Sequence, residues 1–131
     1  MSTVTAPVMT FNAVDNIRAS ATLVAAGTAN YDVDYSAVFE AQIHIKNTPG
    51  GSVSATRGLK IEIFKRTGSG PTIGSSPFMT YYLPSQTAST AESADIYLST
   101  GKYNIKITNL DAAQDIVVVI GADTITNLTT T

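Results

Sequence analysis

Cysteine and tryptophan are absent from this chain of 131 residues, and histidine occurs once, as His44. The absence of cysteine excludes a disulfide framework, a thiolate metal site and a cysteine nucleophile. A zinc ion held by one histidine would need mostly carboxylate ligands, which is an unusual set. A catalytic histidine needs an orienting carboxylate and a nucleophile, which one sequence does not place. We therefore expect no cofactor and no enzymatic activity, and we interpret His44 as a surface or interface side chain.

Charge is scarce as well, at 14% of residues against roughly 25% in an ordinary soluble domain. The formal net charge is -2, and no run of basic residues predicts a nucleic-acid partner. The longest apolar run, Ile116 to Ile120, has the length of a strand and falls far short of the ~20 residues that span a bilayer. The first residues lack the basic and apolar segments of a signal peptide. We expect no membrane partner.

Hydroxyl side chains take the place of charge, with 19 Thr and 12 Ser. A surface of hydroxyls carries little self-repulsion and suits a protein held in an assembly. Threonine is also simply a good strand former, and the composition leaves both interpretations open. The hydrophobic fraction of 44% is that of a globular chain, and the length is sufficient for one domain.

Alternation of apolar and polar residues predicts strands, and no segment has a helical period of useful length. The clearest strand is YSAVFEAQIHIK, residues 35–46, in which Tyr35, Ala37, Phe39, Ala41, Ile43 and Ile45 share one face. The segment 116–122 is apolar on both faces, which predicts a central position. We expect an all-β, Greek-key or jelly-roll-like β-sandwich of about 7–8 antiparallel strands. Its strands are expected at 15–25, 35–46, 59–65, 78–83, 94–98, 103–108 and 116–122.

The domain boundaries follow from small polar residues at both ends of the chain. We expect an extended N-terminal arm over residues 1–12, the sandwich over 13–126 and a polar C-terminal tail over 127–131. Termini of this composition fray unless something holds them. The arm is therefore expected to contact another chain.

A bend is predicted in LSTGKY, residues 98–103, which is similar to the tyrosine corner of Greek-key sandwiches. Gly101 would permit the backbone conformation of the bend, and the Tyr103 hydroxyl would bond a backbone group a few residues upstream. Leu98 would fill the core beside it. Thr100 departs from the pattern, in which proline is frequent. We expect Leu98, Gly101 and Tyr103 to be structural.

Two acidic pairs are weak candidates for chemistry. Asp32 and Asp34 have the first spacing of a calcium loop without its glycine or closing glutamate, and we interpret them as turn residues entering a strand. Glu40 and Glu62 both face outward, as a glycosidase pair would. Basic and polar neighbours on the same faces favour a solvated charge ladder instead.

Contact residues are predicted where exposed aromatic and methionine side chains coincide, because both mark protein interfaces. In FMTYYL, residues 78–83, one of Tyr81 and Tyr82 must face outward if the alternation holds. The apolar and threonine positions of the arm are the second set. The expected partner-binding residues are Thr3, Val4, Thr5, Pro7, Val8, Met9, Phe11, Met79, Tyr81 and Tyr82.

The segments YSAVFEAQIHIK and LSTGKYNIKITNL, the arm and the Gly/Ser-rich loops resemble small decoration or cement proteins of tailed bacteriophages. The resemblance implies a virion structural protein on the capsid surface, made in the host bacterial cytoplasm. It also implies binding to the major capsid protein and to copies of itself, commonly as trimers, with no small-molecule substrate. A neck, tail or baseplate component remains an alternative. A carbohydrate-binding sandwich is a further one, which would need two or three exposed aromatics and polar side chains on one face.

Overall fold

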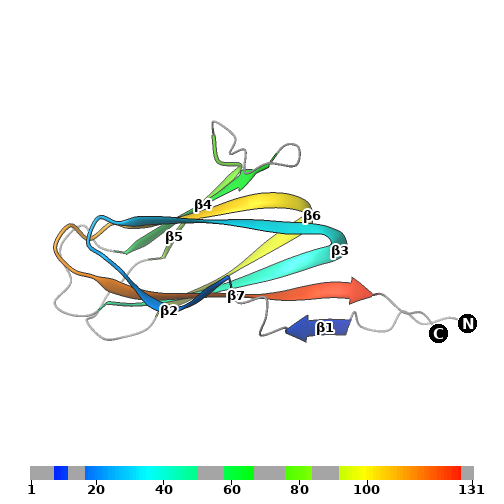
Figure 1. The fold of residues 1–131 in the computed structure, drawn as a ribbon, viewed down its shortest axis with the longest axis horizontal. Coiled ribbons are helices and arrows are strands. Elements are labelled where there is room, and N and C mark those ends of the chain that lie inside the picture. The colour runs from blue at the N-terminus through cyan, green and yellow to red at the C-terminus, as the bar shows by residue number, and fades with distance from the viewer. Residues whose placement is uncertain (1–7, 12–16, 50–57, 67–75, 84–91, 128–131) are drawn as a thin grey trace, which may run out of the picture.

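The computed structural model describes residues 8–11, 17–49, 58–66, 76–83 and 92–127. These residues form seven strands and no helix, so the fold is the all-β, jelly-roll-like sandwich that the sequence predicts (Figure 1). The strands are β1 (Val8–Phe11), β2 (Arg18–Leu23), β3 (Thr28–Pro49), β4 (Leu59–Lys65), β5 (Met79–Leu83), β6 (Glu92–Asn109) and β7 (Ile116–Asn127).

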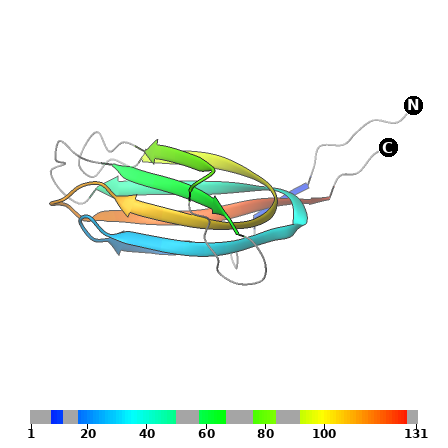
Figure 2. The same ribbon diagram turned by 90° about the horizontal axis from the view of Figure 1, so that it is seen from above.

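One antiparallel sheet folds over on itself to make both layers, because β3 and β6 bend together and cross from one layer to the other (Figures 1 and 2). The first layer has the order β3 (28–35), β6 (101–109), β4, β5. The second layer has the order β6 (92–99), β3 (40–49), β7, with both β1 and β2 on the far side of β7. The residue pattern predicts two separate strands in place of β6 and a shorter strand in place of β3. In the structure each of these strands is continuous.

The core lies between the layers and consists of the inward-facing residues of each strand. In β4, Leu59, Ile61 and Ile63 are fully buried, as the alternation predicts. The central position expected for 116–122 is also observed, because β7 is paired on both sides. The other fully buried large side chains are Ile43, Ile45, Ile96, Leu98, Ile105, Ile107, Ile116, Val118 and Ile120.

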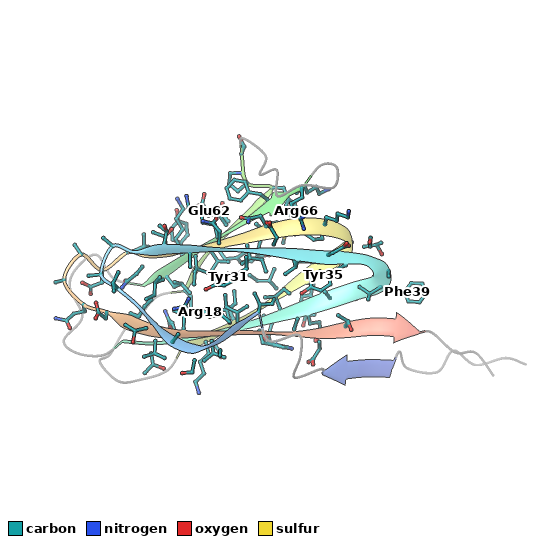
Figure 3. All side chains as sticks on the ribbon, in the orientation of Figure 1. Arg18, Tyr31, Tyr35, Phe39, Glu62 and Arg66 are labelled. Carbon is teal, nitrogen blue, oxygen red and sulfur yellow. The ribbon has the colours of Figure 1, made fainter. Side chains whose placement is uncertain are left out.

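The alternation in β3 fails at the bend. Residues 36–39 of β3 have no partner in the β3–β6 ladder, whereas β6 skips only Thr100, so β3 takes the outer path around the corner. Ala37 and Phe39 were expected on the buried face, yet both are exposed, and the Phe39 side chain projects from the bend (Figure 3). The buried face returns at Ala41. A period of two therefore fails to locate the core where the strand changes layers.

Tyr103 closes the bend from the inside. Its side chain is 2% exposed, and its hydroxyl donates a hydrogen bond to the carbonyl oxygen of Ser99 over 2.8 Å. Gly101 has a φ of +151°, which L side chains rarely adopt. The Thr100 hydroxyl donates to the carbonyl oxygen of Val38 over 2.6 Å and so ties the two bent strands together. This bond gives a role to the threonine that stands where proline is frequent.

The opposite end of the sandwich is closed by Asn109, which is 1% exposed. Its amide nitrogen lies 3.2, 3.1 and 2.9 Å from the carbonyl oxygens of Leu23, Val24 and Gln114. Its amide oxygen accepts from the backbone N–H of Asp111 over 2.9 Å. One buried side chain thus joins the β2–β3 turn to the β6–β7 connection.

Arg18 joins the layers at the edge formed by β2. Its guanidinium donates to the Tyr31 hydroxyl in the first layer and, over 3.2 Å, to the carbonyl oxygen of Val118 in the second (Figure 3). The residue preceding β2, Ile17, packs against the core. The edge beside β7 is therefore covered by the chain's own strand.

Candidate functional site

His44 lies on the outer face of the second layer between two carboxylates from neighbouring strands. Its Nδ1 is 2.6 Å from Asp95 Oδ1 on β6, and its Nε2 is 2.8 Å from Asp123 Oδ2 on β7. The hydrogen bond with Asp95 raises the pKa of His44, partial burial opposes this shift, and the bond with Asp123 reinforces it. When the ring is protonated, both nitrogens donate to carboxylates.

His44 therefore joins three strands, β3, β6 and β7, and we call this arrangement the His44 clamp. With both nitrogens engaged, the ring has no position from which to accept a proton from a nucleophile without breaking one of these bonds. No group of three or more potential metal ligands occurs among the described residues. The sequence missed Asp95 and Asp123, because only the register of β6 and β7 against β3 brings them beside His44.

The first acidic pair lies within β3, so the expected turn is wrong. Asp32 accepts from Asn104 Nδ2 over 2.8 Å and lies 3.7 Å from Arg66 Nε. Asp34 accepts from the hydroxyl and the N–H of Ser36, and these bonds hold the pKa of Asp34 below its usual value. The two carboxylates have separate partners, and the Asp34 bonds support the chain where it enters the bend.

The second acidic pair is divided between the layers. Glu62 pairs with Lys106 and Thr80 in the first layer, and its carboxylate lies 3.8 Å from Lys60 Nζ. Glu40 pairs with Ser99 and Ile125 in the second layer. The predicted charge ladder is observed at Glu62, which has lysines beside it. Because Glu40 and Glu62 lie in different layers, they do not form the two-carboxylate site of a glycosidase.

The expected contact residues of β5 differ in their exposure. Met79 and Tyr81 are half-buried and pack against the core, whereas Tyr82 is 64% exposed. Among the described residues, β5 pairs only with β4, which makes it the edge of the first layer. The strand reads MTYYL and carries no charge. Tyr82 is therefore the member of this set that is free to meet a partner.

The expected arm lies only partly within the described residues. Val8–Phe11 form β1 and pair antiparallel with Asp123–Asn127 of β7 in the same chain. This pairing counts against a free arm over these four residues, which include the predicted contact positions Val8, Met9 and Phe11. Thr3, Val4, Thr5 and Pro7 lie outside the described residues. Contact of the arm with another chain stays a prediction.

Exposed aromatic rings gather around one hollow near the bend. It is lined by Phe39, Glu40, Phe78, Tyr97 and Ser99, and its volume is about 420 Å³. We call these five residues the aromatic hollow. They come from β3, from β6 and from the residue preceding β5. The sequence missed this group, because Phe39 was placed in the core and Tyr97 becomes its neighbour only through the β3–β6 register.

Phe78 is fixed within the aromatic hollow by two contacts. Its ring centroid lies 5.7 Å from that of Tyr103, at an interplanar angle of 31°. The ammonium of Lys65 lies 5.1 Å from the same centroid, within the range of a cation–π interaction. The ring is still 44% exposed. It therefore offers surface without needing to change position.

No family model matches this chain, and no curated protein matches it. No helix with the length and hydropathy of a membrane-spanning segment occurs in the described ranges.

Similar solved structures include carbohydrate-binding modules, an exo-beta-1,3-galactanase and a bacteriophage capsid chain, all at low similarity. A family 16 carbohydrate-binding module is 9% identical, with a TM-score of 0.49, over 86% of this chain and 75% of that chain. A family 35 module in complex with a glucuronic acid-containing disaccharide is 11% identical, with a TM-score of 0.48, over 95% and 96%. A chain of the acid-stable capsid of the Helicobacter pylori bacteriophage KHP30 is 12% identical, with a TM-score of 0.47, over 100% and 98%. At this level the similarities do not choose between functions.

Proposed function

We propose that this chain is a non-enzymatic structural protein of a bacteriophage particle. Its role is that of a capsid decoration protein, which binds the major capsid protein and copies of itself on the capsid surface. The observation that carries the proposal is the uncharged edge strand β5 with its exposed Tyr82. A neck, tail or baseplate position is the alternative for the same kind of docking.

Within the part of the chain that the structure describes, the edge of β5 lacks the usual protection against strand addition. Natural edge strands are commonly blocked by lysine, proline, a bulge or a covering element. Residues 79–83 contain no charge and no proline, and their pairing with β4 runs without a register shift. Such an edge offers backbone donors and acceptors to a strand of a partner, while exposed side chains supply specificity.

Low charge fits this mode of binding. A hydroxyl-rich surface meets several neighbours without large desolvation of ions, and weak contacts made at once add up through effective concentration. We expect the chain to self-associate, and the bacteriophage resemblance implies a trimer. The His44 clamp joins β3 to β6 and β7 across the second layer.

The test is binding of the purified chain to heads of the encoding phage that lack it. Thr80→Lys charges the edge, and Glu62 opposite it in the β4–β5 register accommodates the new lysine in the folded chain. Tyr82→Thr removes the exposed ring and keeps a strand-forming residue. Ala112→Lys adds the same charge at an exposed position between β6 and β7 and serves as the control.

We expect wild type and Ala112→Lys to bind heads, and Thr80→Lys to lose binding. Light scattering after size exclusion should show the same loss of self-association. Equal binding by the edge variants contradicts docking through β5. Labelling of the intact particle by an antibody at the neck, tail or baseplate contradicts decoration and selects the alternative.

A further inference from the structure

We propose that the aromatic hollow binds a neutral carbohydrate, with a pyranose ring stacked on its exposed aromatic side chains. This inference goes beyond capsid docking, because it assigns a second kind of ligand to a site other than the β5 edge. A sugar ring has apolar C–H faces and a rim of hydroxyls. The aromatic hollow offers aromatic surface, a carboxylate and a hydroxyl, which match these two features.

The aromatic surface is large and is not needed by the core. Phe39 is 57% exposed, Tyr97 55% and Phe78 44%, and all three line the same hollow. Scattered exposed apolar residues are ordinary on a protein surface, but a group of rings around one concave site is typical of a contact site. The bend positions Phe39 there, because residues 36–39 leave the β3–β6 ladder.

The polar groups are placed to meet hydroxyls. Among the described residues, no basic side chain lies within 4.0 Å of the Glu40 carboxylate. That carboxylate can therefore accept hydrogen bonds from a ligand. The Ser99 hydroxyl is held 3.1 Å from the Tyr103 hydroxyl. Because the Tyr103 hydroxyl donates to the Ser99 carbonyl oxygen, the Ser99 hydroxyl donates to Tyr103 and keeps the capacity to accept a further hydrogen bond.

Glu40 also discriminates between occupants. An apolar peptide side chain in the aromatic hollow would remove water from the carboxylate and return no hydrogen bond, which is unfavourable. An acidic sugar would place a second negative charge beside it. A neutral hydroxyl-rich ring avoids both effects. The volume of about 420 Å³ lies in the range of small-ligand sites, roughly 300–1,000 Å³.

The experiment is an array of neutral and acidic glycans probed with the full chain and its variants. Phe39→Ala and Tyr97→Ala remove ring surface, and Glu40→Gln removes the charge while keeping an acceptor. Val24→Ala truncates a side chain that is 60% exposed in the β2–β3 turn, and it is the matched control. Binding to a neutral glycan is then quantified by titration calorimetry with that glycan.

We expect binding to at least one neutral glycan, with affinity about tenfold lower in each ring variant and unchanged in Val24→Ala. Each variant's denaturant midpoint confirms that it is folded. An array without signal, a preference for acidic glycans, or equal affinity in the ring variants overturns the inference. Loss of head binding in Phe39→Ala, with no glycan bound, assigns the hollow to protein contact. Failure of the Thr80→Lys test leaves the glycan result unaffected, so the two proposals fail separately.

Discussion

The two ends of the sandwich are closed in opposite ways. At one end Asn109 is buried and its side chain links three backbone carbonyl oxygens and one N–H. At the other end the strands themselves turn the corner over Tyr103, and Phe39 and Tyr97 are left exposed. Asn109, which we call the polar hub, hydrogen-bonds backbone groups, and the exposed side chain of Val24 beside it is apolar but not aromatic. The bend leaves aromatic surface free, so we assign stability to the first end and ligand contact to the second.

The largest effect is expected at the hub. Asn109→Ala leaves buried carbonyl groups without a donor, and we expect a loss of about 3 kcal/mol in the free energy of unfolding. Urea denaturation followed by circular dichroism measures the loss. Phe39→Ala at the opposite end should change stability by less than about 0.5 kcal/mol. Similar losses in the two variants would contradict the division between the ends.

A smaller effect is expected at the bend itself. Tyr103→Phe removes the hydroxyl that donates to Ser99 O, and we expect a loss of about 1 kcal/mol, the typical value of one hydrogen bond. The ring stays, so the packing against Phe78 is retained. Tyr82→Phe, which alters an exposed hydroxyl, is the matched control. An unchanged urea midpoint for Tyr103→Phe would show that the bond does not support the bend.

The smallest effect concerns pH and the outer face of the second layer. The pKa of His44 is raised in the folded chain above its ordinary value of 6.5. Its stabilising contribution is therefore fully present below pH 6.5 and is lost as the pH rises through the folded pKa. We expect the urea midpoint of wild type to exceed that of His44→Gln at acidic pH, and the difference to shrink on the alkaline side. The facing charges are Asp95, Asp123 and Lys46, and Lys46→Gln is the control. A difference that is constant with pH would exclude the clamp.

Much of the fold follows from local pattern. The alternation in β4 and the apolar residues on both faces of β7 identify core residues, because the residue pattern of a strand indicates whether one or both of its faces are buried. Gly101 and Tyr103 identify a bend, since each residue type has a specific backbone or side-chain requirement there. The uncharged segment that forms β5 is also visible in the sequence. These features depend on residues within a few positions of one another.

The sequence alone determined an all-β chain with one core and without thiol chemistry. The tertiary structure decided that β3 and β6 each cross between layers, that Phe39 faces solvent and that Val8–Phe11 join their own sheet. It also decided that His44 meets Asp95 and Asp123, and that Phe39, Phe78 and Tyr97 share a hollow. The physical reason is that alternation specifies the faces of a strand, whereas register and layer are set by pairing between segments far apart in the chain.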